Sequence, residues 1–147
     1  MTLKFVGGLL LALLLTLVTS TKSFAQAIVA TEITEPLAKQ SGDAVRGRAI
    51  VLSRQSGLCI LCHSGPFPEE RFQGNLAPDL GVSAQRLTES QLRARIVDAS
   101  VFNPETIMPA YYRPAGSNRV ASSYAGKTLL TGQEIEDVVA FLMSLKP

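Results

Sequence analysis

The sequence predicts an all-α domain whose helices enclose an apolar group that is not protein. Three segments carry apolar residues at helical spacing, and none shows the alternation typical of a strand. Two long connections, 64–87 and 100–130, hold six of the eight prolines. Structureless loops of this length are uncommon in a compact domain unless they serve a function, and three helices alone make a poor core. A bound group would explain the loops and complete the core.

Residues 1–27 have the pattern of a secretory signal peptide. Lys4 provides a positive n-region, the run 5–18 is almost wholly apolar, and Ala25-Gln26-Ala27 offers a small-x-small cleavage site. Ser23-Phe24-Ala25 offers a second one. Because the apolar run is short for a bilayer span, we expect export with cleavage near Ala27 or Ala25. The alternative is an uncleaved N-terminal anchor.

Residues 28–147, the mature chain, are expected to form one domain. Loss of Lys4 and Lys22 with the signal leaves 12 basic residues against 12 acidic ones, so the mature chain is neutral. A neutral chain lacks the basic surface of a nucleic-acid-binding protein, and we expect no nucleic-acid partner. Residues 28–41 show no strong periodicity, which predicts a loose leading segment.

The first helix is expected to begin at Asp43 and to continue through "DAVRGRAIVLSRQ", with Gly42-Asp43 as its cap. Val45, Ala49 and Leu52 recur at helical spacing and are assigned to its apolar face. Gly47 in mid-helix costs about 1 kcal/mol relative to alanine, which predicts a close approach by another element.

The second and third helices are each predicted from a capping box. Thr88 and Gln91 begin the second helix, with Arg93 and Asp98 expected in solvent and a core face of Leu92, Ile96 and Ala99. Thr131 and Glu134 begin the third helix. Its broad apolar stripe consists of Ile135, Val138, Val139, Leu142 and Leu145.

A C-x-x-C-H motif, Cys59 to His63, contains both cysteines and the only histidine of the chain. Four kinds of site could use it. A disulfide between Cys59 and Cys62 would close a very small loop and stabilise little. A structural zinc site needs four ligands, and the chain has no second Cys/His pair. A thioredoxin-like dithiol needs a βαβ frame, which the sequence does not predict.

The fourth kind of site, c-type haem attachment, uses all three residues of the motif. Each thiol would add to one vinyl group of the porphyrin, so Cys59 and Cys62 would supply two thioether bonds. His63 would donate an imidazole nitrogen to the iron as the proximal ligand. Together with the export signal, the motif predicts one covalently bound haem c per chain.

The distal iron ligand is predicted to be Met108. Once the motif has used the histidine and both cysteines, the mature chain still has two methionines. Met143 lies on the third helix beside Leu142, where ordinary core packing is expected. Met108 lies on a loop before Pro109, which holds the preceding backbone extended and suits a thioether directed into a pocket. Ordinary packing is the alternative for Met108.

Several other side chains could serve the same site. Haem propionates could accept hydrogen bonds from Arg71, Tyr111, Tyr112 and Arg113, although for each of these taken alone packing or solvation is the favoured interpretation. The backbone carbonyl of Pro78 could accept a hydrogen bond from the ring N–H of His63.

Taken together, these features make the chain resemble class I cytochromes c over its whole mature length. The shared features are a helix with Gly47, the C-x-x-C-H motif, a loop methionine and a C-terminal helix with Phe141. The resemblance implies the class I cytochrome c fold, in which the first and last helices cross and a glycine meets an aromatic residue. Gly47 and Phe141 are suitably placed for that contact.

Four longer stretches are similar to the SoxX family, the small monohaem subunits of the thiosulfate-oxidising SoxAX cytochrome. They are "RQSGLCILCHSGPFPEERFQGNLAPDL", "LRARIVDAS", "NPETIMPAYYR" and "LTGQEIEDVVAFL". The resemblance implies a periplasmic heterodimer with the larger cytochrome SoxA. That complex, an L-cysteine S-thiosulfotransferase, couples thiosulfate to a cysteine of the carrier SoxYZ and passes electrons to a downstream cytochrome.

Within such a complex this chain is expected to transfer electrons and not to catalyse sulfur chemistry, since it has no spare cysteine. The mature protein is expected to have no membrane span. The alternatives are a free monohaem electron shuttle for another periplasmic oxidoreductase and a haem-based ligand sensor. A sensor normally needs an open sixth iron position, which a Met108 ligand would close.

Overall fold

The computed structural model describes residues 31–113, 122 and 125–147. The predicted signal peptide, 1–27, and part of the second long connection lie outside these residues. The described residues form helices and no strand, which confirms the all-α class. In chain order the helices are α2 (Ala44–Leu52), η1 (Cys59–Leu61), α3 (Leu80–Arg86), α4 (Glu89–Val97), η2 (Ala99–Val101) and α5 (Gly132–Ser144). None of these helices is long and apolar enough to cross a membrane.

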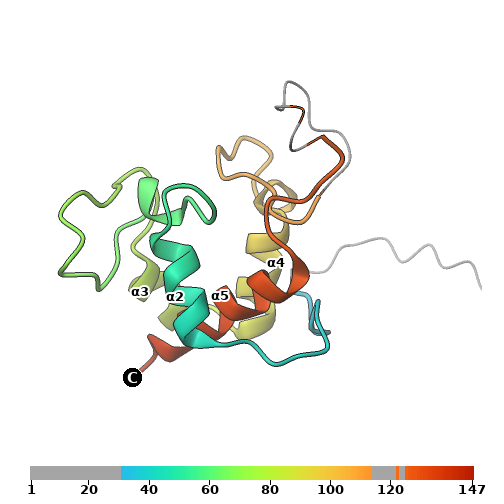
Figure 1. Cartoon of the computed structure of the whole chain (residues 1–147), viewed down its shortest axis with the longest axis horizontal. Helices are drawn as coiled ribbons and strands as arrows, with labels where there is room; N and C mark the ends of the chain where they lie inside the picture. Colours follow the sequence, from blue (N-terminus) through green and yellow to red (C-terminus); the bar gives the residue numbers. More distant parts are fainter. Residues whose placement is uncertain (1–30, 114–121, 123–124) are drawn as a thin grey trace, which may run out of the picture.

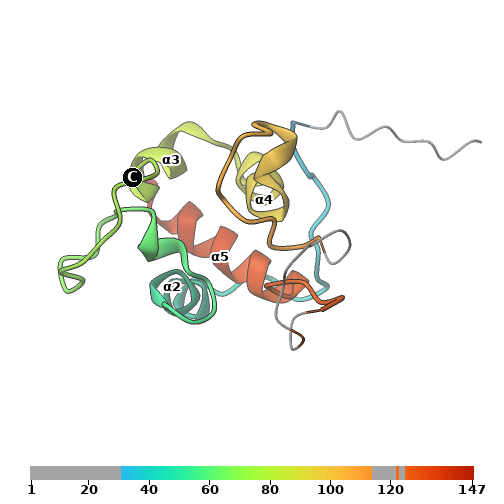
Figure 2. The ribbon, with the colours of Figure 1, turned by 90° about the horizontal axis from the view of Figure 1, so that it is seen from above.

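Helix α5 is the centre of the fold. It packs against α2, α3 and α4, and Figure 2 shows α2 on one side of it and the other two helices on the opposite side. The capping box of Thr131 and Glu134 is present at its start, as predicted. Its buried apolar stripe also agrees with the prediction, except that Phe141 is buried in addition and Leu145, the C-cap, is only half-buried. The buried apolar residues of the helix are Ile135, Val138, Val139, Phe141 and Leu142.

The crossing of α2 and α5 depends on Gly47 (Figure 1). A Cβ atom at this position would lie 1.9 Å from the backbone oxygen of Asp137 and 2.9 Å from the Cβ of Phe141. Only glycine permits the two backbones to come this close. The predicted close approach and the predicted contact between Gly47 and Phe141 are both confirmed. Arg46 adds an ion pair across the same crossing, with its Nε 2.7 Å from Oδ2 of Asp137.

Of the three residues predicted for the apolar face of α2, Leu52 is half-buried and packs against the core, but the prediction is wrong for Val45 and Ala49. Val45 is 81% exposed and Ala49 is also exposed, whereas the buried positions of this helix are Gly47 and Val51. A helical period fixes the spacing of a face but not which face packs, and the close contact at Gly47 turns Val45 outward. The helix begins as expected after the Asp43 cap, but it ends at Leu52 and does not reach Gln55.

The prediction that Arg93 lies in solvent is wrong as well. This side chain of α4 is 1% exposed, and its guanidinium holds Glu136 of α5 through two bonds of 2.8 and 2.9 Å. Glu89 accepts a further bond at 2.5 Å. A paired, fully hydrogen-bonded guanidinium can be buried because its partners replace water. Asp98, also expected in solvent, is largely buried and pairs with Arg113.

The same buried pair fixes the segment before α2, which was predicted to be loose. Arg93 Nη1 donates to the Ile33 carbonyl at 2.8 Å, and the Leu37 N–H donates to Oε1 of Glu136 at 2.9 Å. The Ile33 N–H also donates to the Ser90 carbonyl at 3.0 Å. Residues 33–37 are therefore bound to α4 and α5.

The first long connection contains a helix that the sequence did not predict. Asp79 caps α3 by accepting hydrogen bonds from Gly81 and Val82, and Leu80 and Ala84 are buried. Before this helix, the loop folds back onto the C-x-x-C-H segment. A Cβ atom on Gly74 would lie 2.3 Å from the Leu61 oxygen, and the Gly74 N–H donates to the Ile60 carbonyl at 2.9 Å. This return of the chain determines the surroundings of the motif.

Candidate functional site

The C-x-x-C-H motif occupies a tight turn between α2 and the returning loop. The N–H groups of Cys62 and His63 both donate to the Cys59 carbonyl, at 3.1 and 2.9 Å, and close the short helix η1. Leu58, directly before it, has a φ of 61°, a left-handed conformation that costs a leucine about 1–2 kcal/mol. Strain of this kind persists only where the surroundings impose it, and here it directs the chain into the turn.

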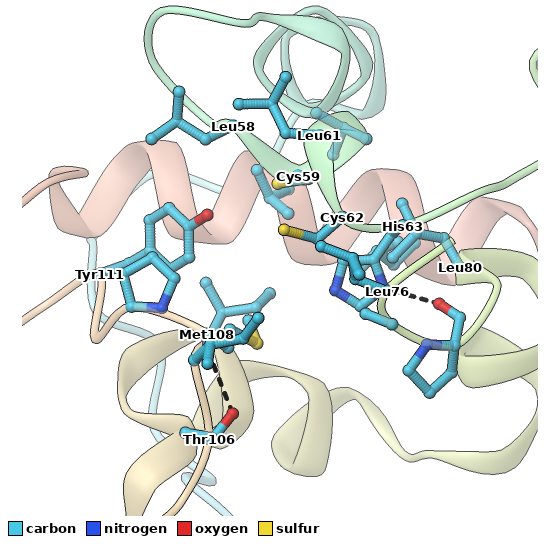
Figure 3. A pocket seen from close by; sticks show the side chains of 18 of the residues that line it. Leu58, Cys59, Leu61, Cys62, His63, Leu76, Leu80, Thr106, Met108 and Tyr111 are labelled. Carbon is cyan, nitrogen blue, oxygen red and sulfur yellow. Dashed lines mark hydrogen bonds between the residues drawn. The ribbon is translucent and has the colours of Figure 1, made fainter. Parts of the chain in front are cut away.

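A cavity of about 590 Å³ lies beside this turn, a volume typical of ligand pockets. Figure 3 shows Cys59, Cys62 and His63 on one side of it and Met108 and Tyr111 on the other. The remaining lining is mostly apolar and includes Val51, Leu58, Leu61, Leu76, Leu80, Ile96, Ile107, Leu130, Val138 and Leu142. The cavity thus brings together all four predicted haem ligands from two distant parts of the chain.

His63 is oriented by a backbone carbonyl. Its Nδ1 lies 2.6 Å from the oxygen of Pro78, and an isolated bridge pairs the His63 backbone with Ala77. A carbonyl can only accept, so Nδ1 carries the proton and Nε2 keeps a free lone pair. An N–H bond of this type fixes the ring and tautomer of a metal-binding histidine. The predicted contact with Pro78 is confirmed.

Both cysteines are free thiols, so the disulfide alternative is not formed. Burial raises the pKa of the Cys59 thiol to about 11, which keeps it protonated at neutral pH. The attacking cysteine of a redox-active dithiol has a lowered pKa, and Cys59 shows the opposite shift. Among the residues that the structure describes, no three His, Cys, Asp or Glu side chains converge on a metal-sized site, so the motif lacks zinc-site geometry.

The two methionines of the mature chain have different surroundings. Met108 is half-buried and lines the cavity, and its N–H donates to Oγ1 of Thr106 at 3.2 Å (Figure 3). Met143 packs against the hydrophobic core and does not line the cavity. Of the two, Met108 alone is in place to reach a group held by the motif.

Of the four side chains considered for haem propionates, only Tyr111 lines the cavity. It is 3% exposed, and its hydroxyl donates to the Gly57 carbonyl at 2.5 Å. Burial raises the pKa of Tyr111, so the phenol remains a donor. Tyr112 and Arg71 are exposed at the surface, and Arg113 pairs with Asp98.

The sequence did not predict the apolar lining contributed by loops. Leu58, Leu76 and Ile107 line the cavity, although Leu76 is 72% exposed and Ile107 77% exposed. Loop residues have no periodicity from which burial or pocket contact could be read. The nearest signal was the place of Leu58 next to the motif and of Ile107 next to Met108, and Leu76 had no such signal.

The residues of the cavity fit a haem c group. Two thiols and an imidazole with a free Nε2 lie on one side, a thioether lies on the other, and the lining between them is mostly apolar. A porphyrin is a large apolar ring that needs such a lining, and thioether and imidazole are common axial ligands of haem iron. No other class of site considered for the motif uses all of these groups.

The chain is similar to a solved structure described as the crystal structure of SoxXA from P. pantotrophus. The two share 34% sequence identity and a TM-score of 0.72, and the match covers 80% of this chain and 91% of that one. No protein-family model matches the chain, and no curated protein matches it in sequence.

Proposed function

This chain belongs to the SoxX family of cytochrome subunits, and from that premise we propose that it accepts electrons in a thiosulfate-oxidising SoxAX complex. In this proposal it is exported to the periplasm and forms a heterodimer with a larger SoxA-like cytochrome. The similarity to a SoxXA structure over 91% of the matched chain supports the partnership. The site itself supports the electron-transfer role.

The observation that carries the proposal is the cavity with the C-x-x-C-H turn on one side and Met108 on the other. Cys59 and Cys62 would hold haem c through thioether bonds, and His63 and Met108 would bind its iron. When bound, haem c supplies reversible one-electron exchange at its iron. The four side chains would thus hold a redox centre between the turn of the motif and the loop of Met108.

The surrounding residues suit a site that accepts electrons. The Pro78 carbonyl keeps His63 in one tautomer, so the same nitrogen always faces the cavity. As a ligand of the haem iron, Met108 would raise the reduction potential relative to many other ligand sets. The buried side chains of Leu80, Ile96 and Leu142 present apolar surface to the cavity.

The chain alone is proposed to be catalytically silent toward thiosulfate. Coupling thiosulfate to the carrier cysteine of SoxYZ forms a sulfur–sulfur bond and releases two electrons. The chain has no cysteine besides Cys59 and Cys62, so it offers no nucleophile for this step. The bond would form on the partner, and this chain would take up the electrons and pass them to a downstream cytochrome.

Stopped-flow mixing tests this division of labour. Oxidised protein is mixed with thiosulfate and carrier, with and without the SoxA-like subunit, and haem reduction is followed by absorbance. We expect rapid reduction only when the larger subunit is present. Equally fast reduction without it would contradict the subunit role and favour a free monohaem shuttle for another periplasmic oxidoreductase.

A further inference from the structure

Tyr111 links the two sides of the cavity. Its hydroxyl donates to the Gly57 carbonyl at 2.5 Å, across 54 positions of the chain. The same carbonyl accepts a longer bond, 3.3 Å, from the Cys59 thiol. A Cβ atom on Gly57 would lie 2.1 Å from the Ile50 carbonyl oxygen, so this residue is packed directly against the end of α2. The phenol therefore reaches a fixed point on the turn that carries the motif.

The backbone of Tyr111 is fixed as well. Its N–H donates to the Ile96 carbonyl at 3.3 Å, and its carbonyl accepts from the Leu130 N–H at 3.1 Å. Tyr112 adds a bond to the Val97 carbonyl at 3.2 Å. These contacts hold the residue between the end of α4 and the start of α5.

The preceding segment, which carries Met108, has no such anchors. Among the described residues, the hydrogen bonds of positions 104–110 stay within the loop: Glu105 and Thr106 bond to Asn103, and Met108 bonds to Thr106. Ile107 is 77% exposed. Met108 itself packs against the edge of the core, so the loop is attached there by apolar contact alone. Tyr111, three residues after Met108, is the nearest point at which hydrogen bonds attach this loop to the rest of the fold.

We infer that Tyr111 is a positioning residue that ties the Met108 loop to the turn of the C-x-x-C-H motif and thereby holds the Met108 sulfur where it would bind the haem iron. The inference rests on the proposed function, in which Met108 binds the iron. A buried phenol-to-carbonyl bond resists displacement of the loop, because opening the loop would leave the Gly57 carbonyl without this donor. Loss of the hydroxyl makes it easier for an outside ligand to replace the methionine.

Competition with imidazole tests this inference on the oxidised holoprotein. Imidazole is titrated into wild type, Tyr111→Phe and Tyr112→Phe, and loss of the sulfur-to-iron charge-transfer band reports displacement of Met108. We expect imidazole to bind Tyr111→Phe about tenfold more tightly than wild type, because one buried hydrogen bond no longer opposes loop opening. Tyr112→Phe removes the same atom from an exposed neighbour and is expected to match wild type.

The outcomes separate the inference from the function on which it rests. A normal band in wild type with unchanged imidazole affinity in Tyr111→Phe would overturn the positioning role and leave the Met108 ligand intact. Absence of the band in wild type would overturn the Met108 assignment and the positioning role together. Thermal unfolding of each variant, measured in parallel, shows that the titrations are made on folded protein, so that a change in affinity reports the loop.

Discussion

The residues proposed to bind haem are each held by a different neighbour. The Pro78 carbonyl fixes the ring of His63, the strained backbone of Leu58 leads into the turn of Cys59 and Cys62, and Tyr111 anchors the loop of Met108. None of these neighbours belongs to the C-x-x-C-H motif. The motif specifies the chemistry, and the neighbours specify the geometry in which it can act.

Replacement of Met108 tests the distal ligand. In oxidised Met108→Ala, we expect the weak sulfur-to-iron charge-transfer band to disappear and the reduction potential to fall, because the thioether that favours the reduced iron is gone. Met143→Leu is the matched control, since Met143 packs in the core away from the cavity, and it should keep the band. Loss of the band in Met143→Leu but not in Met108→Ala would reverse the assignment.

At the scale of single residues, the sequence predicted which potential haem-binding side chains line the cavity, because the signals that mark them are local. Cys59, Cys62 and His63 are nearly contiguous, and Met108 was distinguished from Met143 by the proline that follows it. The role of Tyr111 could not be predicted, since its hydroxyl meets a glycine carbonyl 54 positions away. A hydrogen bond from a side chain to a backbone group so far away along the chain produces no recognisable pattern in a single sequence.

The helices were predictable where their ends carry a local signal. Both capping boxes exist as expected, because the interacting groups lie three residues apart. Helix α3 was not predicted because it has only seven residues, too few to establish a period. The burial of Arg93 was not predicted because its partner Glu136 lies 43 positions away, on another helix.

The crossing of α2 and α5 is tested by Gly47→Ala. The new methyl group would meet a backbone oxygen at 1.9 Å, so the helices must separate. We expect the free energy of unfolding to fall by at least about 2 kcal/mol, although alanine has a better helix propensity than glycine. Urea unfolding of the holoprotein, followed by circular dichroism, measures the change.

Gly81→Ala is the control for this substitution. It places the same methyl group on α3, where the nearest atom is a side-chain oxygen of Asp79 at 3.2 Å. The free energy of unfolding of Gly81→Ala should stay within about 1 kcal/mol of that of wild type. If Gly47→Ala proved as stable as Gly81→Ala, the close crossing of the two helices would be contradicted.

The buried pair of α4 and α5 is tested by Arg93→Met. The change leaves the Glu136 carboxylate buried beside an apolar side chain, which typically costs about 3–5 kcal/mol. Because the same pair binds residues 33–37, amide hydrogen exchange of that segment should accelerate. Arg86→Met, at an exposed position of α3, should change stability by less than about 0.5 kcal/mol. Equal stability of the two variants would refute the role of the pair.

At the scale of the whole molecule, the helices form a frame and the loops form the site. Helix α5 supports α2, α3 and α4, while the segments around the motif and around Met108 supply opposite sides of the cavity. The sequence indicated this division because only three helices were predicted, and the long Pro-rich connections between them were expected to serve a function. A haem in the cavity would complete the core between them.

Whether haem is covalently bound to this chain is the claim on which the other proposals depend. The direct measurement is acid–acetone extraction of the native protein, followed by the intact mass of the polypeptide. We expect the colour to remain with the polypeptide and its mass to equal one mature chain plus one haem, since thioether bonds from Cys59 and Cys62 survive denaturation. Haem that extracts freely into acetone, or a colourless protein that contains zinc, would contradict the account.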